Sequence, residues 1–168
     1  CQQIAKSLKL PEEEVDIAWL TGLLHDVGRF EQQRVYGTFS DAVSIDHAKY
    51  GARILFGEIW EQKTGISAGS EESLPEGIQA DAGITIRDFV EDASEDQLLW
   101  TAVFYHSAYR IPEGLDEQTA MFCHILRDAD KIDILKVNVD FPLEEIYNVS
   151  TEVLYRGEVT PEVMESFD

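Results

Sequence analysis

The sequence predicts an all-α fold, a single-domain helical bundle. Along most of the chain, apolar residues recur at the three- and four-residue spacing of one helix face, and prolines, glycines and acidic residues typical of helix ends separate these segments. No segment has the alternating pattern of paired strands, and we find no internal repeat and no second-domain boundary. The 168 residues are enough to bury the core of one such domain.

The first two predicted helices lie on either side of Pro11. Residues 2–9 have apolar positions at helical spacing and are typical of the end of a helix. Pro11 suits the first position of the next helix, whose first turn is acidic, and we expect this helix to end near Asp26 with Gly28 behind it. Its apolar face is expected to hold Val15, Ala18, Trp19, Gly22 and Leu23.

The rest of the chain predicts further helices separated by loops. Ser94 followed by Gln97 is typical of a capping box, and Asp116 is placed to cap the helix that follows it. The expected elements are a short helix and loop over residues 30–41, helices over 44–61, 84–90, 95–108, 117–137, 142–147 and 161–167, and a loop over 63–80.

Acidic residues outnumber basic ones by 33 to 13, which gives a formal net charge of −20. Such a surface repels the phosphate backbone and argues against duplex nucleic acid as a partner. A small phosphorylated ligand is compatible with it, because a metal and a few local cations reverse the sign within one pocket. No apolar run is long enough to span a bilayer and no signal peptide is found, so no membrane partner is expected. Two cysteines form no disulfide framework, which favours the cytoplasm.

The strongest functional signal is WLTGLLHDVGR, residues 19–29, in which an apolar run ends in His25 and Asp26. Burial of an imidazole and a carboxylate without partners costs several kcal/mol, so other groups must satisfy them. A divalent metal satisfies both, because it binds a neutral imidazole nitrogen and a carboxylate oxygen. A hydrogen-bonded pair that caps a core helix is the alternative, and the doublet alone does not decide between the two.

Further ligand-type side chains lie at inward or helix-end positions. His47 is on the apolar stripe of its predicted helix, and His106 falls near the end of the helix over residues 95–108. A later helix carries Asp128 and Asp130, which point about 200° apart, so at most one of them shares a site with the doublet. Periodicity does not settle which one.

Together these motifs resemble the HD superfamily of metal-dependent phosphohydrolases. The resemblance rests on LLHDVGRF, DHAKYGARIL, FYHSAYR and RDADKID in this order and covers most of the chain. It implies an all-α bundle in which His25, Asp26 and a distant Asp bind a metal, and the Ala-Asp-Lys part of the last motif matches Asp130 to that role. His47 and His106 match positions that hold a second metal or bind the substrate phosphate in this superfamily.

One ligand that the resemblance implies has no counterpart in the sequence. The superfamily's first histidine lies on the helix before the doublet, and that position falls upstream of Cys1. Either the segment that carries it is missing here, or the protein binds metal differently, and we favour the first explanation. We therefore expect one HD-type domain over residues 1–168, with its motif region over 4–137 and its first helix truncated at the N-terminus.

The resemblance implies hydrolysis of a phosphate ester or anhydride, with a nucleotide as the expected small phosphorylated substrate. One or two divalent ions, Mn²⁺, Fe²⁺, Co²⁺ or Mg²⁺, would be the cofactor, and mixed His and carboxylate ligands favour a transition metal. Asp26, His47 and His106 are the expected catalytic residues, with Asp26 either a metal ligand or the general base. Arg29 and Lys131 are candidate phosphate-binding cations or, equally, ordinary surface charges.

Two other functions fit the same motifs. One is a non-catalytic module that senses a metal or a nucleotide, and the other is a di-iron oxygenase of the same superfamily. In each case the loop over residues 30–46 and the acidic segment over 71–96 are expected to form the rim that selects the ligand, because loops on a rigid helical scaffold usually carry specificity.

Overall fold

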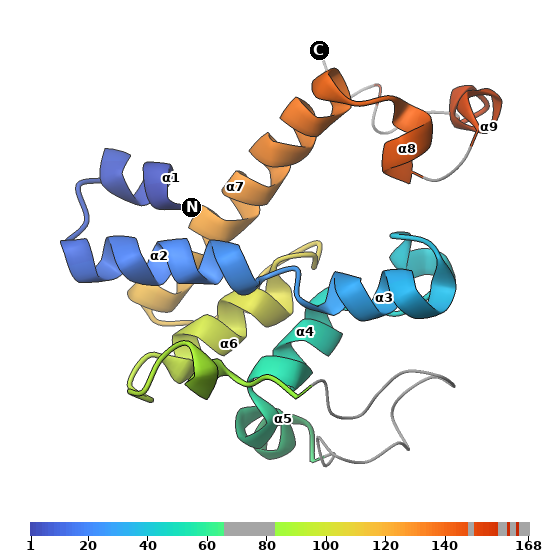
Figure 1. Ribbon diagram of the computed structural model, residues 1–168. Coiled ribbons are helices and arrows are strands. Elements are labelled where there is room, and N and C mark those ends of the chain that lie inside the picture. The colour runs from blue at the N-terminus through green and yellow to red at the C-terminus, as the bar shows by residue number, and fades with distance from the viewer. Residues whose placement is uncertain (66–82, 148–149, 158–160, 162–163, 165–168) are drawn as a thin grey trace.

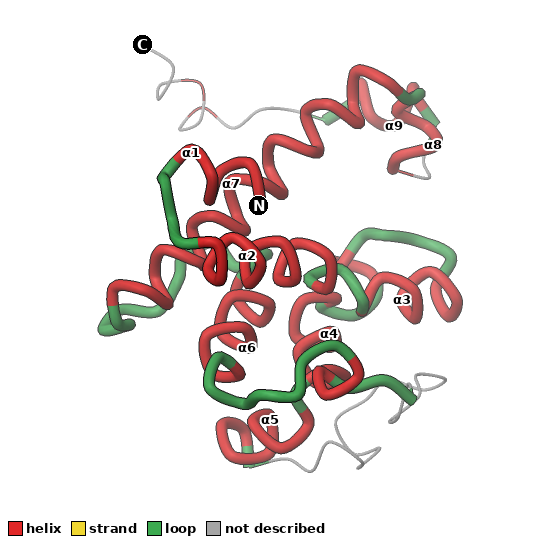
Figure 2. The backbone as a smooth tube through the Cα atoms, turned by 60° about the vertical axis from the view of Figure 1, so that its left-hand side comes forward, coloured by secondary structure: helices red, strands yellow, loops and turns green. Residues whose placement is uncertain are grey.

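The computed structural model describes residues 1–65, 83–147, 150–157, 161 and 164. Within these ranges the chain forms helices and loops without a strand, which confirms the all-α prediction (Figures 1 and 2). No helix in them is both long enough and apolar enough to cross a membrane. The elements are α1 (Gln2–Ser7), α2 (Glu12–Leu24), α3 (Gly28–Tyr36), α4 (His47–Leu55), α5 (Gly57–Thr64), α6 (Asp96–Tyr105), α7 (Glu117–Asp140), α8 (Leu143–Tyr147), α9 (Thr151–Tyr155) and the 3₁₀ turns η1 (Asp41–Val43) and η3 (Ile86–Asp88).

Helix α6 lies in the middle of the body and packs against α2, α4 and α7. Helix α1 packs against α2, and α3 continues beyond the end of α2 and packs against α4 (Figure 1). The second half of α7 extends out of the body and leads to α8 and α9. This arrangement brings the C-terminal ends of α2 and α6 close to the start of α4.

The main hydrophobic core lies between α2, α4, α6 and α7. Leu24, Leu55, Val103 and Phe122 represent the four helices in it, and each has less than a tenth of its surface exposed. The buried residues of α7 all lie in its first half, up to Leu126. The core therefore holds the first half of α7 in place and leaves the second half at the surface.

The apolar face of α2 differs from the prediction. Val15 and Ala18 are buried as expected, but Trp19 and Leu23 are 51% and 56% exposed, and Leu20 and Leu24 are buried instead. The segment is apolar nearly all round, so its periodicity is compatible with more than one buried face, and the packing of α6 and α7 against α2 decides.

The junction of α2 and α3 corrects a second prediction. Helix α2 ends at Leu24, and Gly28 is the first residue of α3 rather than a glycine behind the end of α2. A Cβ added at Gly28 would lie 2.2 Å from the carbonyl oxygen of His47 and 2.9 Å from the backbone nitrogen of Gly51. The glycine therefore permits a backbone contact between α3 and α4 that holds the start of α4. The short helix and loop predicted over residues 30–41 match α3 and the loop after it.

The single helix predicted over residues 44–61 is wrong, because the structure divides it. Asp46 caps α4 by accepting a hydrogen bond from the backbone N–H of Lys49, so the helix begins at His47. Phe56 has φ −127° and ψ 47°, which ends α4 and begins α5. Phe56 is only 3% exposed, and the break accompanies its packing in the main core.

Two other local predictions are also wrong. Segment 84–90 forms only the turn η3, which Thr85 caps, because its β-branched start stays extended. The capping box predicted at Ser94 is absent, because the backbone N–H of Asp96 donates to Ala93 and places Ser94 within a turn before the helix. Glu95 then takes the N-cap position of α6 without a side-chain cap.

The last part of the chain agrees better with the sequence. Asp116 caps α7 by accepting a hydrogen bond from the backbone N–H of Thr119, as predicted, and α8 lies within the helix predicted over 142–147. Helix α7 runs a few residues beyond its predicted end, and α9 was not predicted. Most of the loop predicted over 63–80 and of the helix predicted over 161–167 falls outside the described residues.

Replacement of Gly28 tests the contact between α3 and α4. We expect Gly28→Ala to lower the free energy of unfolding by about 3 kcal/mol, because the new methyl group overlaps the backbone of α4. Urea unfolding measures the change. Gly37→Ala is the control, because Gly37 has φ +63° but nothing lies within 4 Å of an added Cβ, and we expect a loss of about 1 kcal/mol there. An equal loss of unfolding free energy in the two variants would contradict the backbone contact between α3 and α4.

Candidate metal centre

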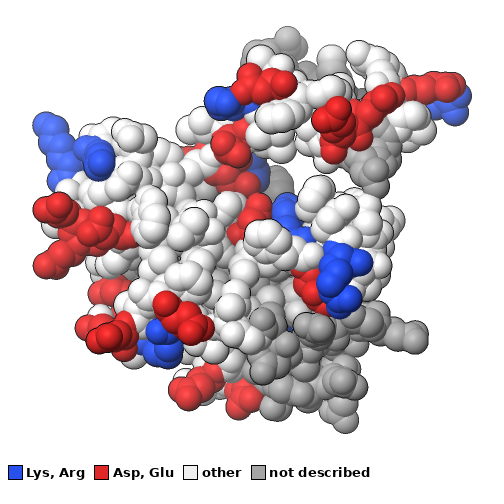
Figure 3. All heavy atoms as spheres, viewed as in Figure 1, with Lys and Arg blue, Asp and Glu red and all other residues white. Residues whose placement is uncertain are grey.

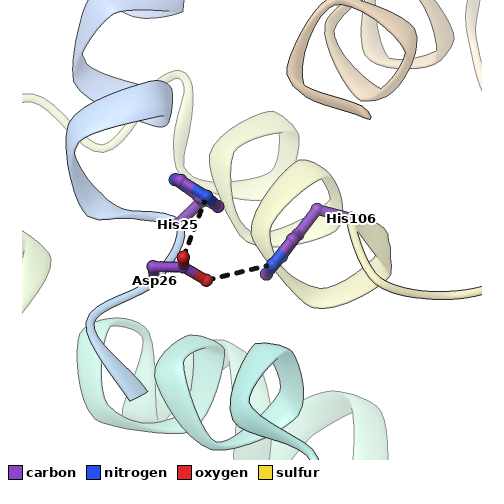
Figure 4. Close-up of side chains that lie close together, drawn as sticks. All are labelled: His25, Asp26 and His106. Carbon is purple, nitrogen blue, oxygen red and sulfur yellow. Dashed lines mark ion pairs between the residues drawn. The ribbon is translucent and has the colours of Figure 1, made fainter. Parts of the chain in front are cut away.

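Four helices bring the predicted site residues together. His25 and Asp26 follow α2, His106 follows α6, His47 is the first residue of α4, and Asp130 lies in α7. Figure 4 shows His25, Asp26 and His106 with their side chains directed toward one another. The ligand-type residues selected from the sequence therefore lie in one place.

Asp26 is the residue that the three imidazole rings share. Its Oδ1 lies 3.2 Å from Nε2 of His47 and 3.5 Å from Nε2 of His106. Its Oδ2 lies 3.4 Å from Nε2 of His25 (Figure 4). Each ring thus directs the same nitrogen, Nε2, at one carboxylate.

A compact set of three possible metal ligands differs by one residue from the predicted set. One donor atom each from His25, Asp26 and His106 all lie within 4.8 Å of one another. The sequence assigns His106 to a second metal or to phosphate, and Asp130 to the first metal. In the structure Oδ1 of Asp130 lies 3.8 Å from Nε2 of His25, so Asp130 borders the compact set.

Two of the histidines also cap the helices that position them. His25 and His106 are the C-cap residues of α2 and α6. Nδ1 of His25 donates to the carbonyl oxygen of Gly22 at 2.8 Å, and Nδ1 of His106 donates to that of Val103 at 2.7 Å. Both acceptors are carbonyls of a last helical turn, which lack an intrahelical partner. Each bond fixes the ring and places the proton on Nδ1.

This tautomer leaves the lone pairs of the Nε2 atoms directed at one another. Nε2 of His47 and Nε2 of His106 are 3.0 Å apart, beside the Asp26 carboxylate. Unprotonated nitrogens at this distance repel unless a proton or a cation lies among them. A divalent metal accepts imidazole and carboxylate lone pairs together, so the donor set fits a metal ion.

The titratable groups respond strongly to one another. Burial acts to raise the pKa of Asp26, but the nearby rings of His106 and His47 and the charge of His25 hold it well below the usual range. Burial likewise acts to lower the pKa of His25, but the nearby carboxylates of Asp130 and Asp26 outweigh it and raise that pKa. The site therefore keeps its carboxylates ionised and favours positive charge.

Sequence reasoning missed two residues that hold His47. Nδ1 of His47 donates to the Asp41 carboxylate, at 2.7 Å from Oδ2. Gln32 is fully buried, and its Nε2 donates to Oδ1 of Asp41 at 2.7 Å and to Oγ of Ser44 at 2.8 Å. Both residues lie in the segment over 30–46, which has no clear periodicity, so no sequence signal marked them.

The two candidate phosphate-binding cations contact carboxylates of the site. Nε of Arg29 donates to Oδ1 of Asp26 at 3.2 Å, and Nη1 of Arg29 donates to the carbonyl oxygen of Phe39 at 3.0 Å. Nζ of Lys131 donates to Oδ2 of Asp130 at 2.6 Å. Both cations are therefore at the site, where they neutralise two of the predicted ligands.

Asp130 rather than Asp128 faces the site. Periodicity left the two residues undecided, and the structure places Asp128 at the surface. Asp130 is partly buried, and the nearby His25 ring lowers the pKa of Asp130 well below the usual range against the effect of burial. The role of Asp130 as a metal ligand, which the motif match implies, stays a prediction.

Two cavities meet at these carboxylates. One, of about 480 Å³, lies between the start of α1, the end of α2 and α7, and His25 lines it. The other, of about 530 Å³, lies between α3, α7 and α8, and we call it the α7–α8 cavity. Asp26, Asp130 and Asp133 line both. In Figure 3 the surface is hollowed between the body and the extended part of α7, and acidic side chains border the hollow.

Comparison with known proteins identifies the family. A family model described as HD domain matches residues 1–135, a range that contains all the residues discussed above as ligands. No curated protein and no solved structure matches the chain. Proteins with this domain are largely metal-dependent phosphohydrolases and bind divalent metals.

Asp41 provides a test of the metal centre. We expect Asp41→Asn to weaken Mn²⁺ binding by about 10-fold or more, because a carboxylate that accepts Nδ1–H orients the ring of His47 and makes its Nε2 a better ligand. Isothermal titration of the metal-free protein with Mn²⁺ measures this. Asp128→Asn, at the surface of α7, is the control and should bind like the unchanged protein. Unaltered affinity in Asp41→Asn would contradict the role.

The raised pKa of His25 predicts a pH dependence of the metal-free protein. The pKa lies above the ordinary value of 6.5, so protonation of His25 stabilises the folded state below that pH, and the contribution disappears as the pH rises through the folded-state pKa. With metal removed by chelation, the free energy of unfolding should fall as the pH rises above 6.5, and more steeply than in His25→Gln. Urea unfolding across this range measures both slopes, and parallel slopes would rule the effect out.

Proposed function

The chain belongs to the HD domain family, and on that premise we propose that it is a metal-dependent phosphohydrolase that acts on a small phosphate ester or anhydride, with nucleotides as the expected class. The observation that carries this proposal is the convergence of three Nε2 atoms on the Asp26 carboxylate, with every Nδ1 already bonded to an oxygen. These lone pairs point into one small space. Such an arrangement suits the binding of a catalytic metal ion and is unfavourable in a core that is only packed.

The residues divide into those that hold metal and those that meet the phosphoryl group. His25, Asp26 and Asp130 would hold one divalent ion, with His106 near enough to join them. A bound ion of this kind lowers the pKa of a water molecule and polarises the phosphoryl group. His47 and His106 direct Nε2 into the same space, where they would bind a second ion or, when protonated, donate to a phosphoryl oxygen.

Asp26 is placed for a second task. Its carboxylate borders both cavities, so it can accept a hydrogen bond from a water molecule that approaches the phosphorus atom and orient that water. Arg29 lies on the side of Asp26 that faces the α7–α8 cavity, which supports its role in binding a phosphoryl oxygen. Lys131, which is hydrogen-bonded to Asp130, would also bind a phosphoryl oxygen.

The experiment is a hydrolysis assay of the full-length protein loaded with Mn²⁺, Co²⁺ or Mg²⁺. Nucleoside mono-, di- and triphosphates, cyclic nucleotides and sugar phosphates serve as substrates, and mass spectrometry follows the products. We expect metal-dependent hydrolysis that falls by at least about 100-fold in Asp26→Ala and in Asp130→Ala. Asp128→Ala is the matched control on α7 and should retain activity.

Other outcomes of the same assay would assign the site differently. Bound metal without any turnover would contradict the hydrolase and favour a module that senses a metal or a nucleotide. Bound iron with an O₂-dependent product would contradict it in favour of an oxygenase. Activity that survives in both aspartate variants would show that the chemistry lies elsewhere.

A further inference from the structure

The geometry points to a phosphomonoester with an uncharged, largely apolar remainder as the substrate class of this site, an inference that rests on the proposed hydrolase function. The α7–α8 cavity and the positions of the chain's cations carry it. With a volume of about 530 Å³, the cavity is of the size that holds a small molecule.

The α7–α8 cavity has an acidic end and apolar walls. Asp26 and Asp130, the proposed metal ligands, line this cavity as they line the other one. Of these two cavities only the α7–α8 cavity is lined by Arg29, the candidate phosphate-binding cation, so a phosphoryl group bound between the metal and Arg29 would place the rest of the substrate there. The apolar part of the lining comes from the loop before η1, from α7 and from α8. Its members are Phe39, Ile134, Val137 and Ile146.

The charged residues that line the cavity can neutralise only one phosphoryl group. Arg29 is the only cation in its lining, and Arg29 is already bonded to Asp26, to Gln32 and to the carbonyl oxygen of Phe39. The other charged residues of the lining are acidic and include Asp133 and Glu145. A second or third phosphate would lie against carboxylates and apolar side chains, where no cation neutralises it.

The rest of the chain does not supply the missing cations. All 13 Lys and Arg residues lie within the described ranges. Among them, only Arg29 and Lys131 form ion pairs with Asp26, Asp41 or Asp130. Others pair with carboxylates away from the site, as Arg87 does with Asp96. The site therefore has too few Lys and Arg side chains to neutralise the negative charge of a nucleoside triphosphate.

The walls of the cavity favour an uncharged remainder with apolar surface. Phe39 is 45% exposed and its ring lies 5.9 Å from the Arg29 guanidinium carbon, and Ile134 is 39% exposed on the facing helix. A planar or apolar group placed between them would remove this surface from water, which is favourable. A sugar with several hydroxyl groups would lose hydrogen bonds to water wherever it lies against the apolar part of the lining, which offers no replacement.

The reaction for this substrate class balances without another reactant. The P–O bond to the remainder breaks, and a P–O bond from the water oxygen forms. One proton of the water is transferred to the departing alcohol oxygen, so the products are the alcohol and inorganic phosphate, and nothing is oxidised or reduced.

The first test compares substrates of equal base and different charge. At equal free Mn²⁺, we expect kcat/KM for a nucleoside 5′-monophosphate to exceed that for the corresponding triphosphate by at least about 100-fold, and phenyl phosphate to exceed glycerol phosphate by at least about 10-fold. Preference for the triphosphate or for the polar ester would overturn the inference and leave the hydrolase function intact.

A charge placed in the cavity gives the second test. Val137→Lys adds a cation to the lining, and we expect it to raise the triphosphate-to-monophosphate ratio of kcat/KM by about 10-fold. Val139→Lys is the matched control, because Val139 is on the same helix, is 85% exposed and does not line the cavity. An equal change of the ratio in both variants, or no change in Val137→Lys, would overturn the inference.

The third test does not depend on hydrolysis. Phenylphosphonate and methylphosphonate carry a P–C bond that this chemistry does not break, and isothermal titration into the Mn²⁺-loaded protein measures their binding. We expect phenylphosphonate to bind at least about 10-fold more tightly, because the ring buries apolar surface of the cavity. Equal affinities would overturn the inference. If no phosphate compound is hydrolysed, the proposed function fails and this titration alone decides the inference.

Discussion

Both nitrogens of a buried imidazole must find partners, and this requirement connects the packing of the bundle to its chemistry. His47 and His106 are 3% and 2% exposed, so water satisfies neither ring. His25 and His106 use the last carbonyls of α2 and α6 for one nitrogen each, and Asp41 serves His47. The second nitrogen of each ring then has Asp26 as its common neighbour. The helices that pack in the core thus also carry the site residues at their ends.

The residues of the site were visible in the sequence because they interrupt apolar surroundings. His25, Asp26, His47 and His106 all stand beside apolar residues at helical spacing, and the structure brings the four together. Periodicity did not decide between Asp128 and Asp130, because apolar residues flank both, and only the motif match pointed to Asp130. That choice depends on where α7 leaves the body, and its buried residues end at Leu126.

Other features depend on contacts that no local pattern encodes. Gln32 and Asp41 lie in a segment without periodicity, and their roles follow from the hydrogen bonds that each makes across the loop to Ser44 and His47. The buried face of α2 depends on which of its apolar sides α6 and α7 cover, and Trp19 is exposed as a result. The break at Phe56 likewise reflects tertiary packing that overrides a continuous helical pattern.

The C-terminal ends of α2 and α6 both face the site, and each helix end carries the negative pole of its macrodipole. Their backbone dipoles add to the charges of Asp26 and Asp130, so the scaffold attracts a cation and repels an anion before any ligand binds. A phosphate group approaches such a place favourably only after the cation has reversed its potential. If the chain acts on a phosphate as proposed, this potential favours an order in which the metal binds before the substrate.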